Sequence, residues 1–231
     1  GYLSGAILYS LFMLFLVLSA VRLLATGILA FLEKRKESSA LAVLQPMTSH
    51  PLVSIIVPAY NEEVNAVKSI HNLLKCKYTS FEIIFVDDGS TDATYGKVQS
   101  AFSDHPRIKI FTKPNGGKAT ALNFGIAKSI AGYVVCIDAD TKLAPDAVTM
   151  LMRNFFIPAN GEVGAVAGTV KVGNEVNILT RWQSIEYIIG QNFDRKAFTY
   201  VNAVTVIPGA IGAYTKKAFQ ESGGLSTDEL A

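Results

Sequence analysis

The chain has 231 residues, half of them apolar, and a formal net charge of +2. This length allows one well-filled core, or one core together with a membrane segment. The near-neutral charge argues against a nucleic-acid partner, because nucleic-acid-binding proteins carry a strongly basic surface. The two cysteines and three histidines lack metal-ligand spacing, so we expect free thiols and no zinc site.

The first expected element is an apolar segment near the N-terminus. Residues 5–21 carry no charge and no proline, Arg22 interrupts the run, and residues 23–32 continue it. About 20 apolar residues span a bilayer as a helix, so we expect a transmembrane helix within residues 1–36. The basic residues lie at or after Arg22, which predicts a cytoplasmic C-terminal side. A signal peptide and a buried soluble helix are weaker alternatives, because no basic region precedes this long run.

Residues 37–50 are expected to form a linker, since serines and Pro46 interrupt a helix there, and residues 51–231 to form one domain. The expected strands cover residues 52–57, 81–86, 107–112, 133–137 and 164–172. The expected helices cover residues 62–74, 93–102, 118–129 and 145–155. Continuous apolar strands separated by helices predict an α/β fold, in which helices cover both faces of a mostly parallel sheet.

Two aspartates follow the fourth expected strand. In α/β sheets, ligands bind beyond the carboxyl ends of the strands. If the backbone stays extended, Asp138 and Asp140 point to the same side. Two carboxylates on one side favour a cation between them, and Mg²⁺ or Mn²⁺ held by few carboxylates shares its shell with phosphate oxygens. A helix cap or a solvated turn is the alternative for this pair.

Two other strand ends carry residues suited to ligands. In the acidic turn of residues 87–92, we favour Asp88 as an acceptor for a ligand such as a nucleobase. Residues 115–118 (NGGK) open a helix, where glycines let the backbone approach a phosphate and Lys118 adds positive charge. An ordinary glycine turn with a solvated lysine is the alternative. The P-loop pattern and the GxGxxG dinucleotide pattern are absent.

Together these motifs resemble the family 2 glycosyltransferases with the GT-A fold. The resemblance is carried in order by VSIIVPAYNEE, FVDDGSTDAT, KPNGGKATALNFGI, IDADT, VGAVAGTVK, IEYIIGQNFDRKAF and IPGAIGAYTKKAF. It covers residues 51–231 and looks nearest to membrane-bound processive synthases of β-linked polysaccharides, in particular poly-N-acetylglucosamine and chitin-oligosaccharide synthases.

The resemblance implies roles for individual residues. Those near the nucleotide-sugar would be Pro58, Tyr60, Glu62, Asp88, Lys118, Asp138 and Ala139. Asp88 would accept from the uracil, and Lys118 would contact the diphosphate or uracil region. Asp140, together with Asp138, would hold the catalytic Mg²⁺ or Mn²⁺. The residues near the glycan acceptor would be Gly209, Ala210 and Gly212. Residues 181–198 would form a helical segment at the membrane interface.

By the same resemblance, the protein would be an inverting glycosyltransferase. It would transfer a sugar, preferably N-acetylglucosamine, from a UDP-sugar to a growing β-linked polysaccharide at the inner membrane face. An acceptor hydroxyl would attack the anomeric carbon while a carboxylate removes its proton. A non-processive membrane-bound transferase and a catalytically silent nucleotide-sugar-binding subunit are the alternatives.

The general base is expected near the C-terminal end of this sequence. In the family, an acidic pair follows a Gly-Gly step and precedes a Gln-x-x-Arg-Trp segment. Here Gly223-Gly224 is present and Gln-x-x-Arg-Trp is absent. We therefore expect a truncated domain that binds donor and metal but turns over poorly. Its base would lie just beyond Ala231, with Asp228 as a weaker candidate.

Overall fold

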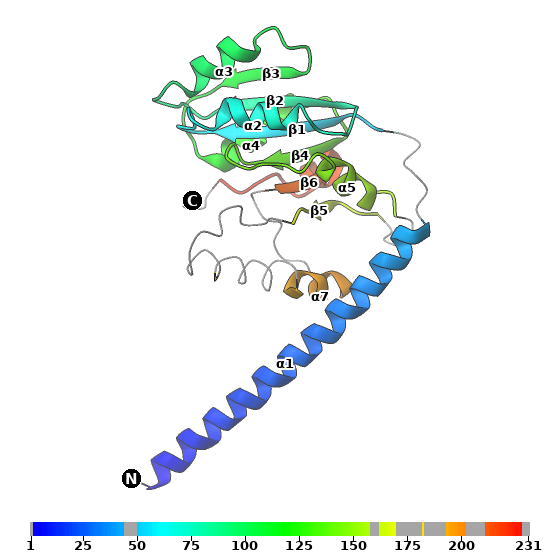
Figure 1. The fold of residues 1–231 in the computed structure, drawn as a ribbon. Helices are drawn as coiled ribbons and strands as arrows, with labels where there is room; N and C mark the ends of the chain where they lie inside the picture. Colours follow the sequence, from blue (N-terminus) through cyan, green and yellow to red (C-terminus); the bar gives the residue numbers. More distant parts are fainter. Residues whose placement is uncertain are drawn as a thin grey trace. The chain divides into compact units, whose positions relative to one another are not determined.

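A computed structural model describes residues 2–43, 50–157, 162–169, 182, 193–201 and 211–227, with side chains from residue 5 to 39 in the first range. The chain divides into two compact units (Figure 1). One unit comprises Gly1–Val43 and Thr169–Val206, and the other comprises Leu44–Gly168 and Ile207–Ala231. Each unit is described separately below.

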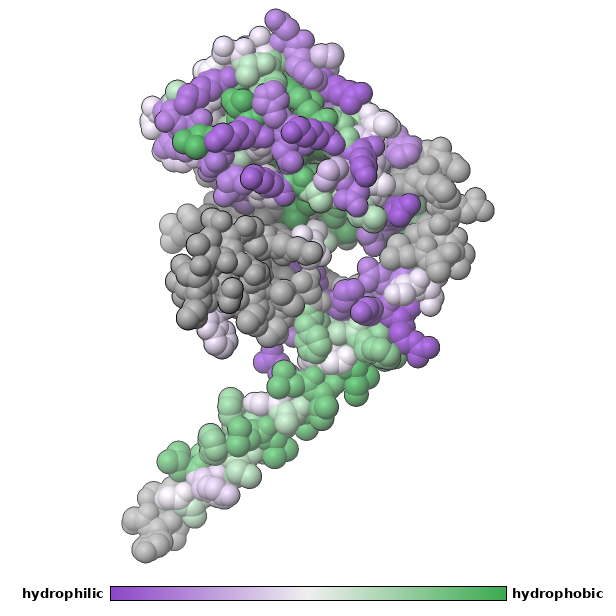
Figure 2. Space-filling view, viewed as in Figure 1, coloured by the Kyte–Doolittle hydropathy of each residue, from purple (hydrophilic) through white to green (hydrophobic). Residues whose placement is uncertain are grey.

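The first unit contains a long apolar helix, α1 (Tyr2–Val43). Its 42 residues extend about 63 Å at ~1.5 Å per residue, about twice the ~30 Å hydrocarbon thickness of a bilayer. Within Gly5–Ser39 lies a strongly apolar stretch of 18 residues, and Figure 2 shows apolar side chains along the helix. By length and composition, α1 is suited to span a membrane. It continues past the expected end at Lys36, because the next residues are compatible with a helix.

A short helix, α7 (Arg195–Tyr200), packs on α1 within the same unit. The Lys196 ammonium lies 2.6 Å from the Glu37 carboxylate. Ala30 of α1 is buried, and a Cβ placed on Gly27 would lie 3.5 Å from the Phe193 ring. The interfacial segment expected over residues 181–198 lies mostly outside the described residues.

The second unit is built on a six-stranded sheet with the strand order β3-β2-β1-β4-β6-β5. The strands are β1 (Val53–Ala59), β2 (Phe81–Asp87), β3 (Ile108–Thr112), β4 (Tyr133–Ile137), β5 (Ala165–Ala167) and β6 (Ile211–Thr215). Strands β3, β2, β1 and β4 are parallel, whereas β6 is antiparallel to both of its neighbours. The expected α/β fold with a mostly parallel sheet is confirmed. Strand β6 was not expected from its sequence, IGAYT, because glycine and alanine are poor strand formers.

Helices cover the sheet and bury its apolar strands. They are α2 (Ala66–Leu73), α3 (Thr94–Phe102), α4 (Lys118–Lys128), α5 (Ala147–Asn154) and α8 (Lys216–Glu221). One core cluster joins sheet residues to α4 and α8: Ile56, Ile84, Val86, Ala121, Leu122, Ile126, Val134, Cys136 and Phe219. Alternate strand residues such as Ile55 and Ile83 are also fully buried and point to the other face, where α2 lies in front of the sheet (Figure 1).

Helix α4 lies close against the sheet at Gly125. A Cβ there would lie 2.5 Å from Cγ2 of Ile56 and 3.1 Å from Cγ2 of Val86. A larger residue would therefore push the helix away from the sheet. Because Lys118 is the first residue of α4, this contact also fixes the position of the helix that carries Lys118.

Candidate functional site

The four parallel strands end at the same edge of the sheet. Ala59 of β1 pairs with Asp87 of β2, and Asp87 pairs with Thr112 of β3. The segments that follow β1, β2 and β3 therefore begin side by side, and β4 ends beside β1, where Cys136 pairs with Ile56. We call these segments, residues 60–62, 88–90, 113–118 and 138–140, the carboxyl edge. They contain most of the polar residues singled out from the sequence.

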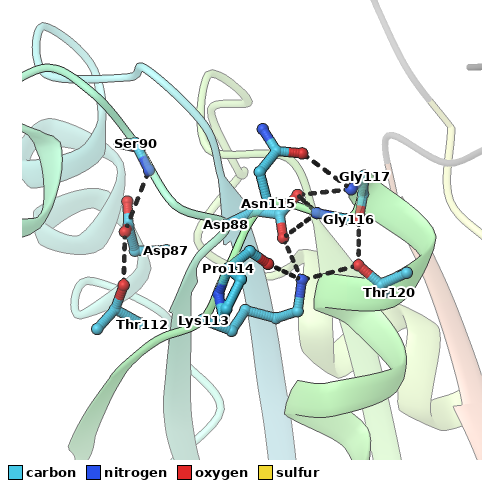
Figure 3. A network of polar contacts seen from close by, with 10 residues as sticks. All are labelled: Asp87, Asp88, Ser90, Thr112, Lys113, Pro114, Asn115, Gly116, Gly117 and Thr120. Carbon is cyan, nitrogen blue, oxygen red and sulfur yellow. Dashed lines mark hydrogen bonds and ion pairs between the residues drawn. The ribbon is translucent and has the colours of Figure 1, made fainter.

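Asp88 is buried at this edge, with an exposed fraction of 3%. Figure 3 shows its carboxylate enclosed by the loop that leads into α4. Oδ2 accepts hydrogen bonds from the backbone N–H groups of Gly117, at 2.8 Å, and Gly116, at 3.3 Å. Oδ1 accepts from Lys113 Nζ and, at 3.2 Å, from the shared Gly116 N–H. The amides of the glycine loop, where the sequence suggested that a phosphate could approach, donate to Asp88 in this structure.

Lys113 is the cation of this network. Its ammonium donates to Asp88 Oδ1, to the Pro114 carbonyl at 2.6 Å and to Thr120 Oγ1 at 2.9 Å. The Thr120 hydroxyl in turn donates to the Gly117 carbonyl at 2.8 Å. Lys113 thus joins the acidic turn after β2 to the first turn of α4 (Figure 3).

Gly89 allows the acidic turn and the glycine loop to come together. Its φ of 72° lies in the left-handed region, which favours glycine. A Cβ at this position would lie 2.7 Å from the backbone nitrogen of Asn115. Any other residue would therefore separate Asp88 from the loop that holds it.

Asp87 has a different role from its neighbour. Its Oδ2 accepts from Thr112 Oγ1 at 2.9 Å and from the Ser90 N–H at 3.3 Å, which fixes the turn after β2 (Figure 3). Its Oδ1 is buried and has no hydrogen-bond partner among the described residues. Asp87 therefore connects β2, β3 and the acidic turn.

Asp138 and Asp140 occupy a turn, not an extended segment. Strand β4 ends at Ile137, and the Thr141 N–H donates to the Asp138 carbonyl at 3.0 Å. The prediction that extended backbone aligns the two side chains is wrong for this reason. Asp138 is partly buried and pairs with Lys118, whereas Asp140 is exposed and Ala139 between them is buried.

These two carboxylates suit a hard divalent cation that takes its remaining ligands from elsewhere. No cluster of three or more His, Cys, Asp or Glu side chains with metal-binding geometry occurs within the described ranges. Mg²⁺ characteristically binds to one or two carboxylates and completes its shell with phosphate oxygens and water. The oxygen donors of Asp138 and Asp140 fit that pattern and do not fit a zinc site.

The segment after β1 brings an exposed ring to the edge. Tyr60 is 48% exposed, while Pro58 is buried within β1. Asn61 adopts a left-handed φ of 55°, and its Oδ1 accepts from the Thr91 N–H at 2.9 Å. The Glu62 N–H donates to Thr94 Oγ1 at 2.7 Å. The segment is thereby tied to the acidic turn and to α3.

The expected acceptor residues are only partly described. Gly212 lies buried in β6, where it pairs with Cys136 of β4. Gly209, Ala210 and Asp228 lie outside the described residues.

Asn123 connects α4 to the segment that follows Gly223-Gly224. Its Nδ2 donates to the Leu225 carbonyl at 2.9 Å, and its Oδ1 accepts from the Leu225 N–H at 3.0 Å. Both glycines have positive φ values, 82° and 83°. One helix thus carries Lys118 at its start and holds the Gly-Gly-Leu segment at its middle.

Three residues at or near this edge were missed from the sequence: Asn61, Lys113 and Thr120. Lys113 directly precedes the PNGG segment, so a lysine at a strand end was an available signal. The left-handed backbone of Asn61 and the hydroxyl contacts of Thr120 leave no comparable signal, since both depend on distant segments.

Comparisons with known proteins agree with this fold. The model of the family described as "Glycosyl transferase family 2" matches residues 54–223. A solved mannosyltransferase from Pyrobaculum calidifontis, in complex with GDP-Man and Mn²⁺, is 26% identical with a TM-score of 0.67. The alignment covers 92% of this chain and 58% of that protein. The GT-A-type architecture is therefore confirmed.

Curated relatives include two staphylococcal poly-beta-1,6-N-acetyl-D-glucosamine synthases. The Staphylococcus aureus (strain COL) protein is 32% identical over 178 residues, and the Staphylococcus epidermidis protein is 30% identical over the same length. Each alignment covers 77% of this chain and 43% of the relative, so the chain spans less than half of either synthase. With the family model matching most of its length, the chain belongs to glycosyl transferase family 2.

Proposed function

We propose that the carboxyl edge binds a UDP-sugar, with the nucleoside near Asp88 and Tyr60 and the diphosphate near Lys118, Asp138 and Asp140. The observation that carries the proposal is the convergence of these groups after adjacent parallel strands of a family 2 chain. The exposed ring of Tyr60 offers a surface for a base, since bases stack on aromatic side chains. Pro58, Glu62 and Ala139 are proposed to line the nucleotide-sugar pocket.

Asp138 and Asp140 are proposed to hold Mg²⁺ or Mn²⁺, in keeping with the Mn²⁺ bound by the Pyrobaculum relative. A bound divalent cation would stabilise the negative charge of the departing diphosphate. Lys118 pairs with Asp138, and its side chain is 43% exposed. Lys118 can therefore contact a diphosphate, either by breaking its ion pair with Asp138 or by contacting Asp138 and the diphosphate together.

The proposed reaction is inverting transfer of N-acetylglucosamine to a growing β-linked polysaccharide at the cytoplasmic membrane face. The similarity to poly-beta-1,6-N-acetyl-D-glucosamine synthases supports this donor and product, and α1 supports the membrane location. Gly209, Ala210 and Gly212 are proposed to lie near the glycan acceptor, whose hydroxyl would attack the anomeric carbon. The hydroxyl proton would pass to a carboxylate that follows the Gly223-Gly224 step.

The proposal is tested by titrating the full chain, in detergent micelles, with UDP in the presence and absence of Mn²⁺. We expect Mn²⁺ to strengthen UDP binding at least about tenfold, and Asp140→Ala to remove that gain. Lys142→Ala, a nearby lysine with no proposed contact, serves as the matched control. Absence of UDP binding by the unmodified chain would refute the proposed site.

Donor and product are tested separately with radiolabelled nucleotide-sugars and the whole protein. UDP-N-acetylglucosamine should give long polymer, and the other donors should not. Addition of a single sugar would instead favour the non-processive transferase. Donor binding without transfer would favour the silent subunit.

A further inference from the structure

We propose that Lys113 is a positioning residue of the donor site, which fixes Asp88 against the glycine loop and thereby sets the affinity for the nucleoside half of the donor. The inference rests on the proposed function, because it explains the donor affinity of that same site. Lys113 itself would not touch the donor.

The first step concerns the hydrogen bonds that Lys113 has available. A lysine ammonium has three N–H donors. All three have acceptors within the protein: Asp88 Oδ1, the Pro114 carbonyl and Thr120 Oγ1. The side chain is only 16% exposed. Lys113 thus has no donor left for a ligand, unlike the more exposed Lys118.

The second step concerns the acceptor capacity of Asp88. A carboxylate accepts about four hydrogen bonds. Asp88 receives bonds from three donors, Lys113 and the N–H groups of Gly116 and Gly117, with the Gly116 N–H shared between both oxygens. The two contacts of the shared Gly116 N–H, at 3.2 and 3.3 Å, are the longest, whereas Lys113 and the Gly117 N–H fix the direction of the carboxylate. A nucleobase N–H would replace one of the two long Gly116 contacts.

The third step concerns what would happen without the lysine. Asp88 is 3% exposed, and a buried carboxylate is costly unless it is paired with a cation and hydrogen-bonded. Lys113 is the only cation within 4.0 Å of Asp88 among the described residues. Without it, the carboxylate would turn toward solvent and release the Gly116 and Gly117 amides. The nucleoside end would lose its fixed acceptor, while Lys118 and Asp138 would remain in place.

The test separates the two halves of the donor. The full chain is titrated with UDP, with uridine and with pyrophosphate plus Mn²⁺. We expect Lys113→Met to weaken UDP and uridine binding by a similar factor, about tenfold or more, since a hydrogen bond to a charged group is being lost. Pyrophosphate binding should change less than about twofold, because its proposed contacts are untouched.

Three variants control this experiment. Lys109→Met removes another β3 lysine, one that pairs with Glu82, and should leave all three ligands unaffected. Lys113→Arg should restore much of the uridine affinity, because it keeps the cation. Thr120→Val, which removes one Lys113 contact, should give the same uridine-selective loss at about threefold to fivefold, and it serves where Lys113→Met fails to fold.

The outcomes are distinguishable. Unchanged uridine binding by Lys113→Met, or equal losses for uridine and pyrophosphate, would overturn the inference and leave the proposed donor site intact. Lack of UDP binding by the unmodified chain would overturn both. A selective loss of uridine affinity that Lys113→Arg reverses would establish the positioning role.

Discussion

Two of the buried acidic residues near the ends of strand β2, Glu82 and Asp88, differ in what surrounds them. Near its start, Glu82 accepts from Ser54 Oγ at 2.5 Å and pairs with Lys109 of β3 at 2.8 Å. Just past its end, Asp88 pairs with Lys113 and accepts from the amides of a glycine loop.

Burial and an ion pair are therefore not enough to identify a binding residue in this chain. The partners of Glu82 include the side chains of two strands, and a further hydroxyl, Ser129, donates to Ser54 at 2.7 Å. The partners of Asp88 lie in a loop at the carboxyl edge, where α/β sheets bind ligands. The contrast predicts a structural role for Glu82 and a binding role for Asp88.

The largest expected effect separates these two carboxylates directly. Asp88→Asn and Glu82→Gln should each lower the free energy of unfolding by about 1–3 kcal/mol, because each removes charge-assisted hydrogen bonds. Only Asp88→Asn should weaken UDP binding, by about tenfold or more. Chemical denaturation and UDP titration measure the two quantities. Weakened UDP binding in Glu82→Gln would break the distinction.

A second prediction concerns Lys118, whose ion pair is more exposed than that of Lys113. Lys118→Gln should change the free energy of unfolding by less than about 0.5 kcal/mol, since exposed ion pairs contribute little to stability. It should weaken UDP and pyrophosphate binding by about the same factor, near tenfold, and spare uridine. Thermal unfolding and the three titrations check both parts. A uridine-selective loss would instead place Lys118 at the nucleoside.

A third prediction concerns acid stability at the start of β2. Burial alone would raise the pKa of Glu82, but hydrogen bonds from Lys109, Ser54 and the Ile130 N–H outweigh it, so the pKa is lowered. A carboxyl group whose pKa is lower in the folded chain than in the unfolded chain stabilises the fold at pH values above its unfolded pKa, about 4.3. This stabilisation is lost as the pH falls through the folded-state pKa. Glu82→Gln should therefore flatten the fall in stability below about pH 4.3. Urea denaturation between pH 3 and 6 would show it, and an unchanged slope would contradict it.

The smallest expected effect is at Cys136, which lies in β4 two residues before Asp138. Burial raises the pKa of this thiol to about 12, although the nearby Lys118 opposes the shift. Cys136 should therefore resist alkylation at pH 8 in the folded chain, and the half-buried Cys76 should react first. Mass spectrometry after brief labelling gives the order. Early labelling of Cys136 would mean that this part of the sheet opens readily.

The sequence predicted the parallel strands and the edge at which their polar ends meet. Runs such as residues 81–86 are apolar and β-branched enough to identify buried strands without a structure. It did not predict the turn at Asp138–Asp140 or the antiparallel strand β6, because both depend on contacts with distant residues. The sequence also did not predict that Asp88 accepts hydrogen bonds from the Gly116 and Gly117 N–H groups. The NGG motif is the same whether its N–H groups face a phosphate or an aspartate.

The close contact at Gly125 has a consequence for motion. A helix whose backbone lies against Ile56 and Val86 has no room to move closer to the sheet when a ligand arrives. Any adjustment to an incoming nucleotide must then come from the loop of residues 113–117 and from side chains. Amide hydrogen exchange should accordingly change on UDP binding at Gly116 and Gly117 but remain slow and constant in the middle of α4.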